Sequence, residues 1–78
     1  MANNAINLNV IEENASEWVN QGNATKKGKT ISIDLKKMGY DKLLGTGVPS
    51  QAYNITISAA SAKAVEKVEA AGGEIING

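Results

Sequence analysis

The sequence is informative first through what it lacks. Its 78 residues include no cysteine and no histidine, and all eight basic residues are lysine. Without cysteine, disulfides and thiolate zinc sites are excluded, and without histidine the commonest general base and metal ligand is missing. The absence of arginine counts against base reading through paired guanidinium hydrogen bonds. We therefore expect no enzyme activity, no metal and no cofactor.

Long apolar runs are also missing. No stretch approaches the ~20 apolar residues needed to span a membrane, and the first five residues lack the basic and apolar regions of a signal peptide. The sequence therefore predicts a cytosolic protein that makes no membrane contact. A length of 78 residues predicts one domain, with a flexible segment over residues 1–5 and a single globular domain over residues 6–78.

The charges are balanced in sum but not in position. Residues 1–24 carry three glutamates and no lysine, whereas residues 25–45 carry six lysines against two aspartates. Residues 46–78 return to a slight acidic excess. The chain thus has a basic middle between two acidic ends.

Periodicity predicts the first half of the fold. Ile6, Leu8 and Val10 alternate like a brief strand, and Asn9 with Glu12 has the spacing of a capping box at a helix start. Apolar residues then recur at helical spacing, and we expect Trp18 among them to anchor the helix to the core rather than to stack on a ligand. Gly22 is expected to end this helix.

The second half is predicted to contain three strands and one helix. Residues 30–35 and 54–58 alternate as half-buried strands, and Asp34 is expected to cap a single helical turn that closes at Gly39. Ser61 is a suitable N-cap for an amphipathic helix, Gly72 supplies its stop, and residues 74–76 follow as a strand. The order predicts a small α/β domain with two main helices.

Two motifs admit a functional and a plain interpretation. Gly45-Thr46-Gly47 invites comparison with a phosphate loop, but the lysine, the following hydroxyl residue and the helix of that motif are missing, so a turn is favoured. The basic turn of residues 25–30, centred on Gly28, could contact phosphates or be a solvated turn that keeps the domain soluble.

Residues 33–47 and 61–73 together resemble the C-terminal globular domain of large-subunit ribosomal protein L-fifteen, of the archaeal or eukaryotic type. The similarity rests on a lysine-bearing segment that ends in Leu44-Gly45-Thr46-Gly47, a strand, and a serine-capped helix that closes with alanine and two glycines. The L-eighteen-e family shares the second half. The resemblance implies an irregular superhelical stack of strand and helix units, and a chain that is the C-terminal part of a longer parent protein.

The resemblance also implies a structural constituent of the large ribosomal subunit, located in the cytoplasm, with large-subunit ribosomal RNA as its partner. The basic middle then supplies the expected RNA contacts, with lysines touching phosphates and glycines permitting close backbone approach. These residues are Lys26, Lys27, Lys29, Lys36, Lys37, Lys42, Gly45 and Gly47.

A second hypothesis follows from the zero net charge, which removes most of the counterion-release energy that drives RNA binding. The domain would then be a protein-interaction module that rests on neighbouring ribosomal proteins. An exposed apolar patch around Val48, Tyr53 or Ile76 would favour this alternative. Either way we expect no small-molecule substrate, and a monomer in isolation.

Overall fold

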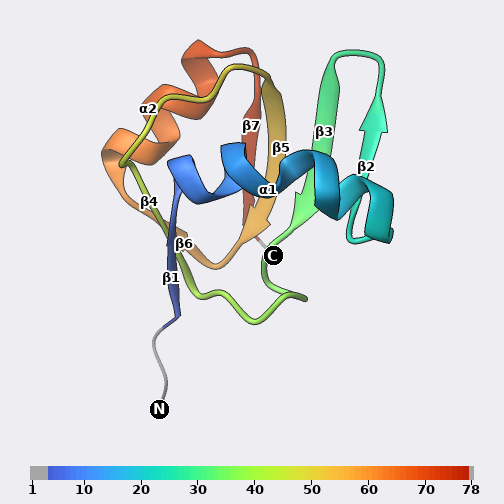
Figure 1. Cartoon of the computed structure of the whole chain (residues 1–78). Coiled ribbons are helices and arrows are strands. Elements are labelled where there is room, and N and C mark those ends of the chain that lie inside the picture. The colour runs from blue at the N-terminus through green and yellow to red at the C-terminus, as the bar shows by residue number, and fades with distance from the viewer. Residues whose placement is uncertain (1–3, 78) are drawn as a thin grey trace.

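The computed structural model describes residues 4–77 as an α/β arrangement of two helices and short strands (Figure 1). The predicted α/β class is confirmed. The elements in chain order are β1 (Ala5–Asn7), α1 (Leu8–Gln21), β2 (Ala24–Lys27), β3 (Thr30–Asp34), β4 (Lys42–Leu44), β5 (Ala52–Ile57), β6 (Ala59–Ala60), α2 (Ala62–Ala70) and β7 (Glu74–Asn77).

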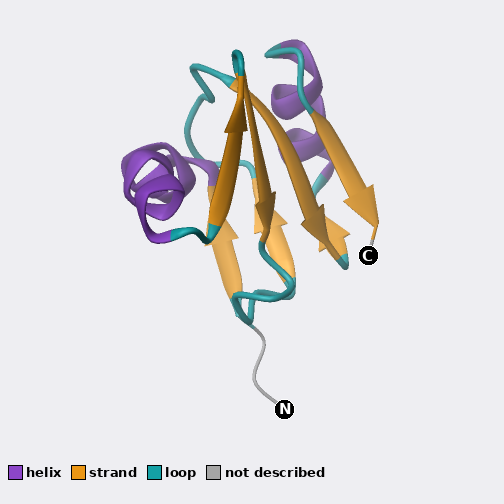
Figure 2. Ribbon diagram, turned by 90° about the vertical axis from the view of Figure 1, so that its right-hand side faces the viewer, coloured by secondary structure: helices purple, strands orange, loops and turns teal. Residues whose placement is uncertain are grey.

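The strands form two sheets. Three parallel strands pair in the order β1-β4-β6, and four strands pair in the order β2-β3-β5-β7. Within the four-stranded sheet, β2 and β3 are antiparallel whereas β3, β5 and β7 are parallel. In Figure 2, α1 and α2 lie at opposite sides of the view with strands between them.

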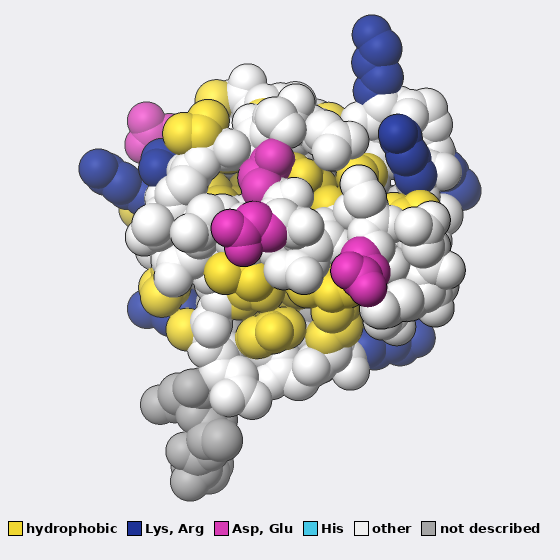
Figure 3. Space-filling view, viewed as in Figure 1, with side chains coloured by type: hydrophobic (Ala, Val, Ile, Leu, Met, Phe, Trp, Pro, Cys, Tyr) yellow, Lys and Arg dark blue, Asp and Glu magenta, His cyan; other side chains and the backbone are white. Residues whose placement is uncertain are grey.

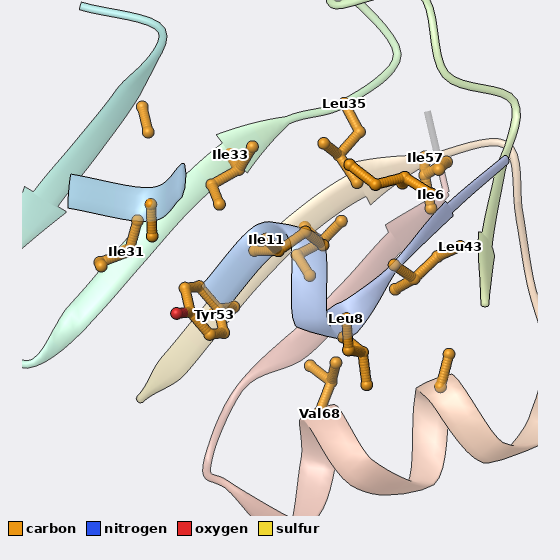
Figure 4. Packing of buried hydrophobic residues seen from close by; sticks show 14 residues of the cluster. Ile6, Leu8, Ile11, Ile31, Ile33, Leu35, Leu43, Tyr53, Ile57 and Val68 are labelled. Carbon is orange, nitrogen blue, oxygen red and sulfur yellow. The ribbon is translucent and has the colours of Figure 1, made fainter. Parts of the chain in front are cut away.

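Both sheets and both helices contribute to one hydrophobic core (Figure 4). In β5 the buried residues Tyr53, Ile55 and Ile57 alternate with half-buried ones, as the period of two in a strand requires. The parallel register places Ile31 beside Tyr53 in the adjacent strand. The predicted alternation in residues 30–35 and 54–58 is therefore correct in which side chains it buries.

The start of the chain differs from the prediction in two ways. Asn9 and Glu12 form no capping box, because α1 already begins at Leu8 after an N-cap at Asn7 whose side chain makes no capping bond. Strand β1 is correspondingly short and begins at Ala5, one residue before the predicted boundary of the globular part. Asn4 also pairs with the turn before β4, since the Asp41 backbone N–H donates to its carbonyl at 2.7 Å. Residues 1–3 of the predicted flexible segment lie outside the described residues.

The end of α1 follows its prediction. Gly22 adopts a positive φ of 83°, and the N–H of Asn23 donates to the Trp18 carbonyl at 2.8 Å, as in a Schellman motif. Trp18 is half-buried and packs against the core, which confirms its predicted anchoring role.

A hairpin between residues 24 and 34 was only partly foreseen. The basic turn is the two-residue loop of this hairpin, with Gly28 at φ 60°, as a type II′ turn needs glycine at its first central position. Strand β2 escaped prediction because only Ala24 of its four residues is buried, so it carries no apolar alternation. Strands β4 and β6 escaped for a related reason, since they are three and two residues long.

The second helix matches its prediction closely. The Ser61 hydroxyl accepts a hydrogen bond from the Ala64 N–H at 3.2 Å, and Gly72 ends the helix with φ 89°. Ala64 and Val68 are buried on its inner face.

Candidate functional site

The six lysines of the basic middle do not form one patch. Lys26, Lys27 and Lys29 lie on the β2–β3 hairpin, whereas Lys36 and Lys37 lie in the turn that follows the opposite end of β3. Lys42 begins β4 in the other sheet. In Figure 3 basic side chains accordingly lie at separate places around the outline, and acidic side chains cross the middle of the face. The structure thus divides the predicted site into a hairpin group, a turn group and Lys42.

The turn after β3 is built as predicted. The Asp34 carboxylate accepts a hydrogen bond from the backbone N–H of Lys37 at 3.0 Å, and the N–H of Gly39 donates to the Lys36 carbonyl at 3.1 Å. Gly39 closes the turn with φ 94°. The side chains of Lys36 and Lys37 are exposed, so they are accessible to a phosphate.

Gly45 and Gly47 are packed against the chain's own helices. A Cβ on Gly45 would lie 2.8 Å from the Lys63 Cβ in α2, and one on Gly47 would lie 2.6 Å from the Asn9 nitrogen in α1. These contacts account for both glycines within the fold. Close approach of RNA to the two residues stays a prediction.

Lys67 ties the same loop to α2. Its Nζ donates to the carbonyl oxygens of Gly45 at 2.7 Å and Gly47 at 2.8 Å. The sequence placed Lys67 on the outward face of the helix with Lys63, but the structure leaves it half-buried under this loop. Since its three donors are largely committed to the fold, Lys67 serves the loop and not the surface charge.

A polar network that the sequence did not reveal lies between α1 and β5. One oxygen of the Glu12 carboxylate accepts hydrogen bonds from the Ser50 N–H at 2.6 Å and the Tyr53 hydroxyl at 2.9 Å, and the other accepts from the Ser50 hydroxyl at 2.7 Å. These partners are 38 and 41 residues from Glu12 along the chain. No local spacing could therefore have indicated them.

The network shifts the titration of both of its acids. Burial acts to raise the pKa of Glu12, but the hydrogen bonds from Ser50 and Tyr53 outweigh it, so this pKa lies below its ordinary value of 4.5. Burial raises the pKa of Tyr53, and the nearby Glu12 carboxylate raises it further. A hydrogen bond from Gln51 opposes this rise in the Tyr53 pKa, as a donor to the phenolic oxygen does. The four side chains thus form a continuous network with Glu12 ionised.

The apolar patch named in the second hypothesis is not continuous. Tyr53 is fully buried, whereas Val48 is 75% exposed and Ile76 is 40% exposed. Val48 lies in the loop before β5 and Ile76 lies in β7, and they line different hollows. Val48 adjoins Pro49 and the end of α2 at a hollow of about 180 Å³.

Within residues 4–77 no group of three or more acidic side chains is placed to hold a metal ion. No helix in this part of the chain is long and apolar enough to cross a membrane.

Comparison with known proteins decides the family. Residues 5–76 match the family model that describes the ribosomal proteins 50S-L15 and 50S-L18e and their counterpart in the 60S subunit. The chain belongs to this family. It is 41% identical over 73 residues to large ribosomal subunit protein uL15 of Methanobrevibacter smithii, covering 94% of this chain and 50% of the relative. It is 38% identical over 71 residues to the protein of the same name from Archaeoglobus fulgidus, covering 91% and 40%. The chain spans about half the length of the curated relatives it matches.

Seen on this ribosomal-protein fold, the hairpin lysines border a hollow. A space of about 420 Å³ is lined by Lys26, Gly28 and Lys29 from the hairpin and by Ser50 and Gln51 from the loop before β5. A second hollow of about 220 Å³, beside the end of α1, shares Lys26 and Gln51 with the first. The two spaces therefore adjoin at these two side chains.

Proposed function

We propose that this chain is part of a structural protein of the large ribosomal subunit and binds large-subunit ribosomal RNA. The observation that carries the proposal is the family match over residues 5–76 together with archaeal relatives that are named as large-subunit ribosomal proteins. A structural and not an enzymatic role follows from this family. Its place of action would be the ribosome in the cytoplasm.

The lysines of the basic middle support the RNA partner. All six are exposed, and flexible ammonium groups suit contacts to backbone phosphates that carry no sequence information. Their distribution over three places fits an RNA surface that touches the domain at several points, with each contact releasing counterions. Gly45 and Gly47 would then act indirectly, by keeping the loop after β4 close to both helices.

The test is filter binding of the chain to a large-subunit ribosomal RNA transcript between 50 and 300 mM KCl, roughly the range where phosphate contacts dominate the salt dependence. Two triple variants remove the same charge: Lys26→Gln, Lys27→Gln, Lys29→Gln in one, and Lys36→Gln, Lys37→Gln, Lys42→Gln in the other. We expect each triple to weaken binding and to reduce the salt slope by about one per lysine that contacts a phosphate.

Lys63→Gln is the control, because Lys63 is an exposed lysine outside the basic middle. It should leave the affinity close to that of the unsubstituted chain. An affinity that neither triple variant changes at low salt would show that the basic middle is not the RNA contact.

Docking on neighbouring ribosomal proteins is the second candidate function. It is favoured by the zero net charge and by Val48, which is 75% exposed beside the apolar hollow at the end of α2. A contact of this kind would depend little on salt and would weaken in Val48→Ser. Association with large-subunit proteins that falls steeply with salt and ignores Val48→Ser would contradict it.

A further inference from the structure

The two hollows that adjoin at Lys26 and Gln51 form a groove between the β2–β3 hairpin and the loop before β5. We call it the hairpin groove. One side is the hairpin tip with Lys26 and Lys29, and the other side is Ser50 and Gln51, with Ala71 at the end of α2 also lining the larger hollow. The larger hollow, of about 420 Å³, has room for a phosphate group with its attached sugar oxygens.

One wall of the hairpin groove is held by hydrogen bonds. Ser50 donates both its N–H and its hydroxyl to Glu12, and Gln51 interacts with the buried Tyr53. These bonds fix the wall before any ligand arrives, which lowers the entropy that binding would cost. They also commit the Ser50 hydroxyl proton to Glu12, so hydrogen bonds to an anion must come from the lysines and from the second N–H of the Gln51 amide.

The charge of the hairpin groove is positive. Lys26 and Lys29 are the ionisable side chains among the described residues that line its two hollows. The Glu12 carboxylate stands behind Ser50 and has its charge dispersed over three hydrogen bonds. By contrast, the hollow of about 390 Å³ on the four-stranded sheet is lined by Lys37 together with Asp34, so its charges oppose each other.

We propose that the hairpin groove seats a backbone phosphate of RNA between Lys26 and Lys29, next to the Gln51 amide. This inference rests on the proposed function and names the place on the domain where a phosphate is held and not merely approached. Two ammonium groups on one side and a fixed amide on the other would contact different phosphate oxygens. Lys36 and Lys37, on a convex turn, would contribute only diffuse attraction.

The experiment compares two double variants of equal charge in binding to the large-subunit ribosomal RNA transcript. Lys26→Gln with Lys29→Gln should weaken binding about tenfold and lower the salt slope by about two. Lys36→Gln with Lys37→Gln should weaken it less than about threefold. Equal losses from the two pairs would overturn the groove while leaving RNA binding intact, whereas failure of the unsubstituted chain to bind would overturn the proposed function as well.

A variant that keeps every lysine separates the groove from charge alone. Ala71→Phe places a large side chain at the larger hollow, and Ala71 is half-buried with φ −87°, a conformation that phenylalanine accepts. We expect it to weaken RNA binding about tenfold, with thermal unfolding as the check that the fold is kept. Binding equal to that of the unsubstituted chain would overturn the proposal.

The last arm distinguishes phosphate from carboxylate. Poly-glutamate and polyuridylate, matched in charge and length, are titrated against the labelled chain, with the amide signals of residues 26–29 and 50–51 as the readout. Saturable shifts with polyuridylate at concentrations where poly-glutamate causes none support a phosphate seat. Equal shifts with both polymers would mean that the groove recognises any anion, including an acidic protein, and would overturn it.

Discussion

The carboxylate of Glu12 and the buried hydroxyl of Tyr53 are joined by a hydrogen bond of 2.9 Å. The two residues are 41 positions apart and belong to α1 and β5. Tyr53 is fully buried, so its hydroxyl needs a partner inside the fold. This contact links the acidic helix to the central strand pair and also orders the loop that forms one wall of the hairpin groove.

The first prediction concerns acid. The pKa of Glu12 is lowered in the folded chain, so its ionised form stabilises the fold at pH values above the ordinary 4.5 of a glutamate. This contribution is lost as the pH falls through the lowered value. Urea denaturation between pH 7 and pH 2.5 should show the free energy of unfolding decreasing less steeply below about pH 5 in Glu12→Gln than in the unsubstituted chain.

Glu13→Gln is the matched control for that series, since Glu13 is an exposed glutamate on the same helix. It should keep the pH dependence of the unsubstituted chain. Identical slopes for Glu12→Gln and Glu13→Gln below pH 5 would count against a stabilising role for the ionised Glu12.

A second prediction concerns the lysine beneath the loop after β4. Lys67→Met keeps most of the aliphatic stem but removes both hydrogen bonds to the Gly45 and Gly47 carbonyls. It should lower the free energy of unfolding by about 1–3 kcal/mol, because two half-buried carbonyls lose a charged donor. Lys63→Met, one turn earlier and exposed, should change it by less than ~0.5 kcal/mol. Equal effects of the two substitutions in urea denaturation would contradict this role of Lys67.

A third prediction concerns Gly47, which has φ 106° and packs against the start of α1. Gly47→Ala places a Cβ in this unfavourable backbone region and 2.6 Å from the Asn9 nitrogen. It should cost more than ~2 kcal/mol of stability, since backbone strain and a collision add. Gly22→Ala is the comparison, because Gly22 has φ 83° but nothing within 4 Å of its Cβ position.

Gly22→Ala should accordingly cost only about 1–2 kcal/mol, the penalty of a left-handed backbone alone. Thermal unfolding of both variants measures the difference. A smaller loss for Gly47→Ala than for Gly22→Ala would show that the loop after β4 can move away from α1.

Much of the local structure could be read from the sequence because its signals are local. Ser61 and Gly72 mark the limits of α2 by a side-chain cap and a left-handed glycine, and Gly22 marks the end of α1. The alternation in residues 53–57 shows which side chains are buried. These features depend on neighbours within a few residues, so the order of amino acids was sufficient to predict them.

The sequence also determined the family resemblance and the total charge available to a partner. Only the tertiary structure decided how that charge is used. It placed Lys26 and Lys29 on one groove and Lys36 and Lys37 at the other end of β3, and it brought Lys67 beneath a loop some twenty residues earlier. It also paired Glu12 with Ser50 and Tyr53 in place of a helix cap. Each of these outcomes depends on strand pairing and packing between distant segments, whose energies no short window of sequence contains.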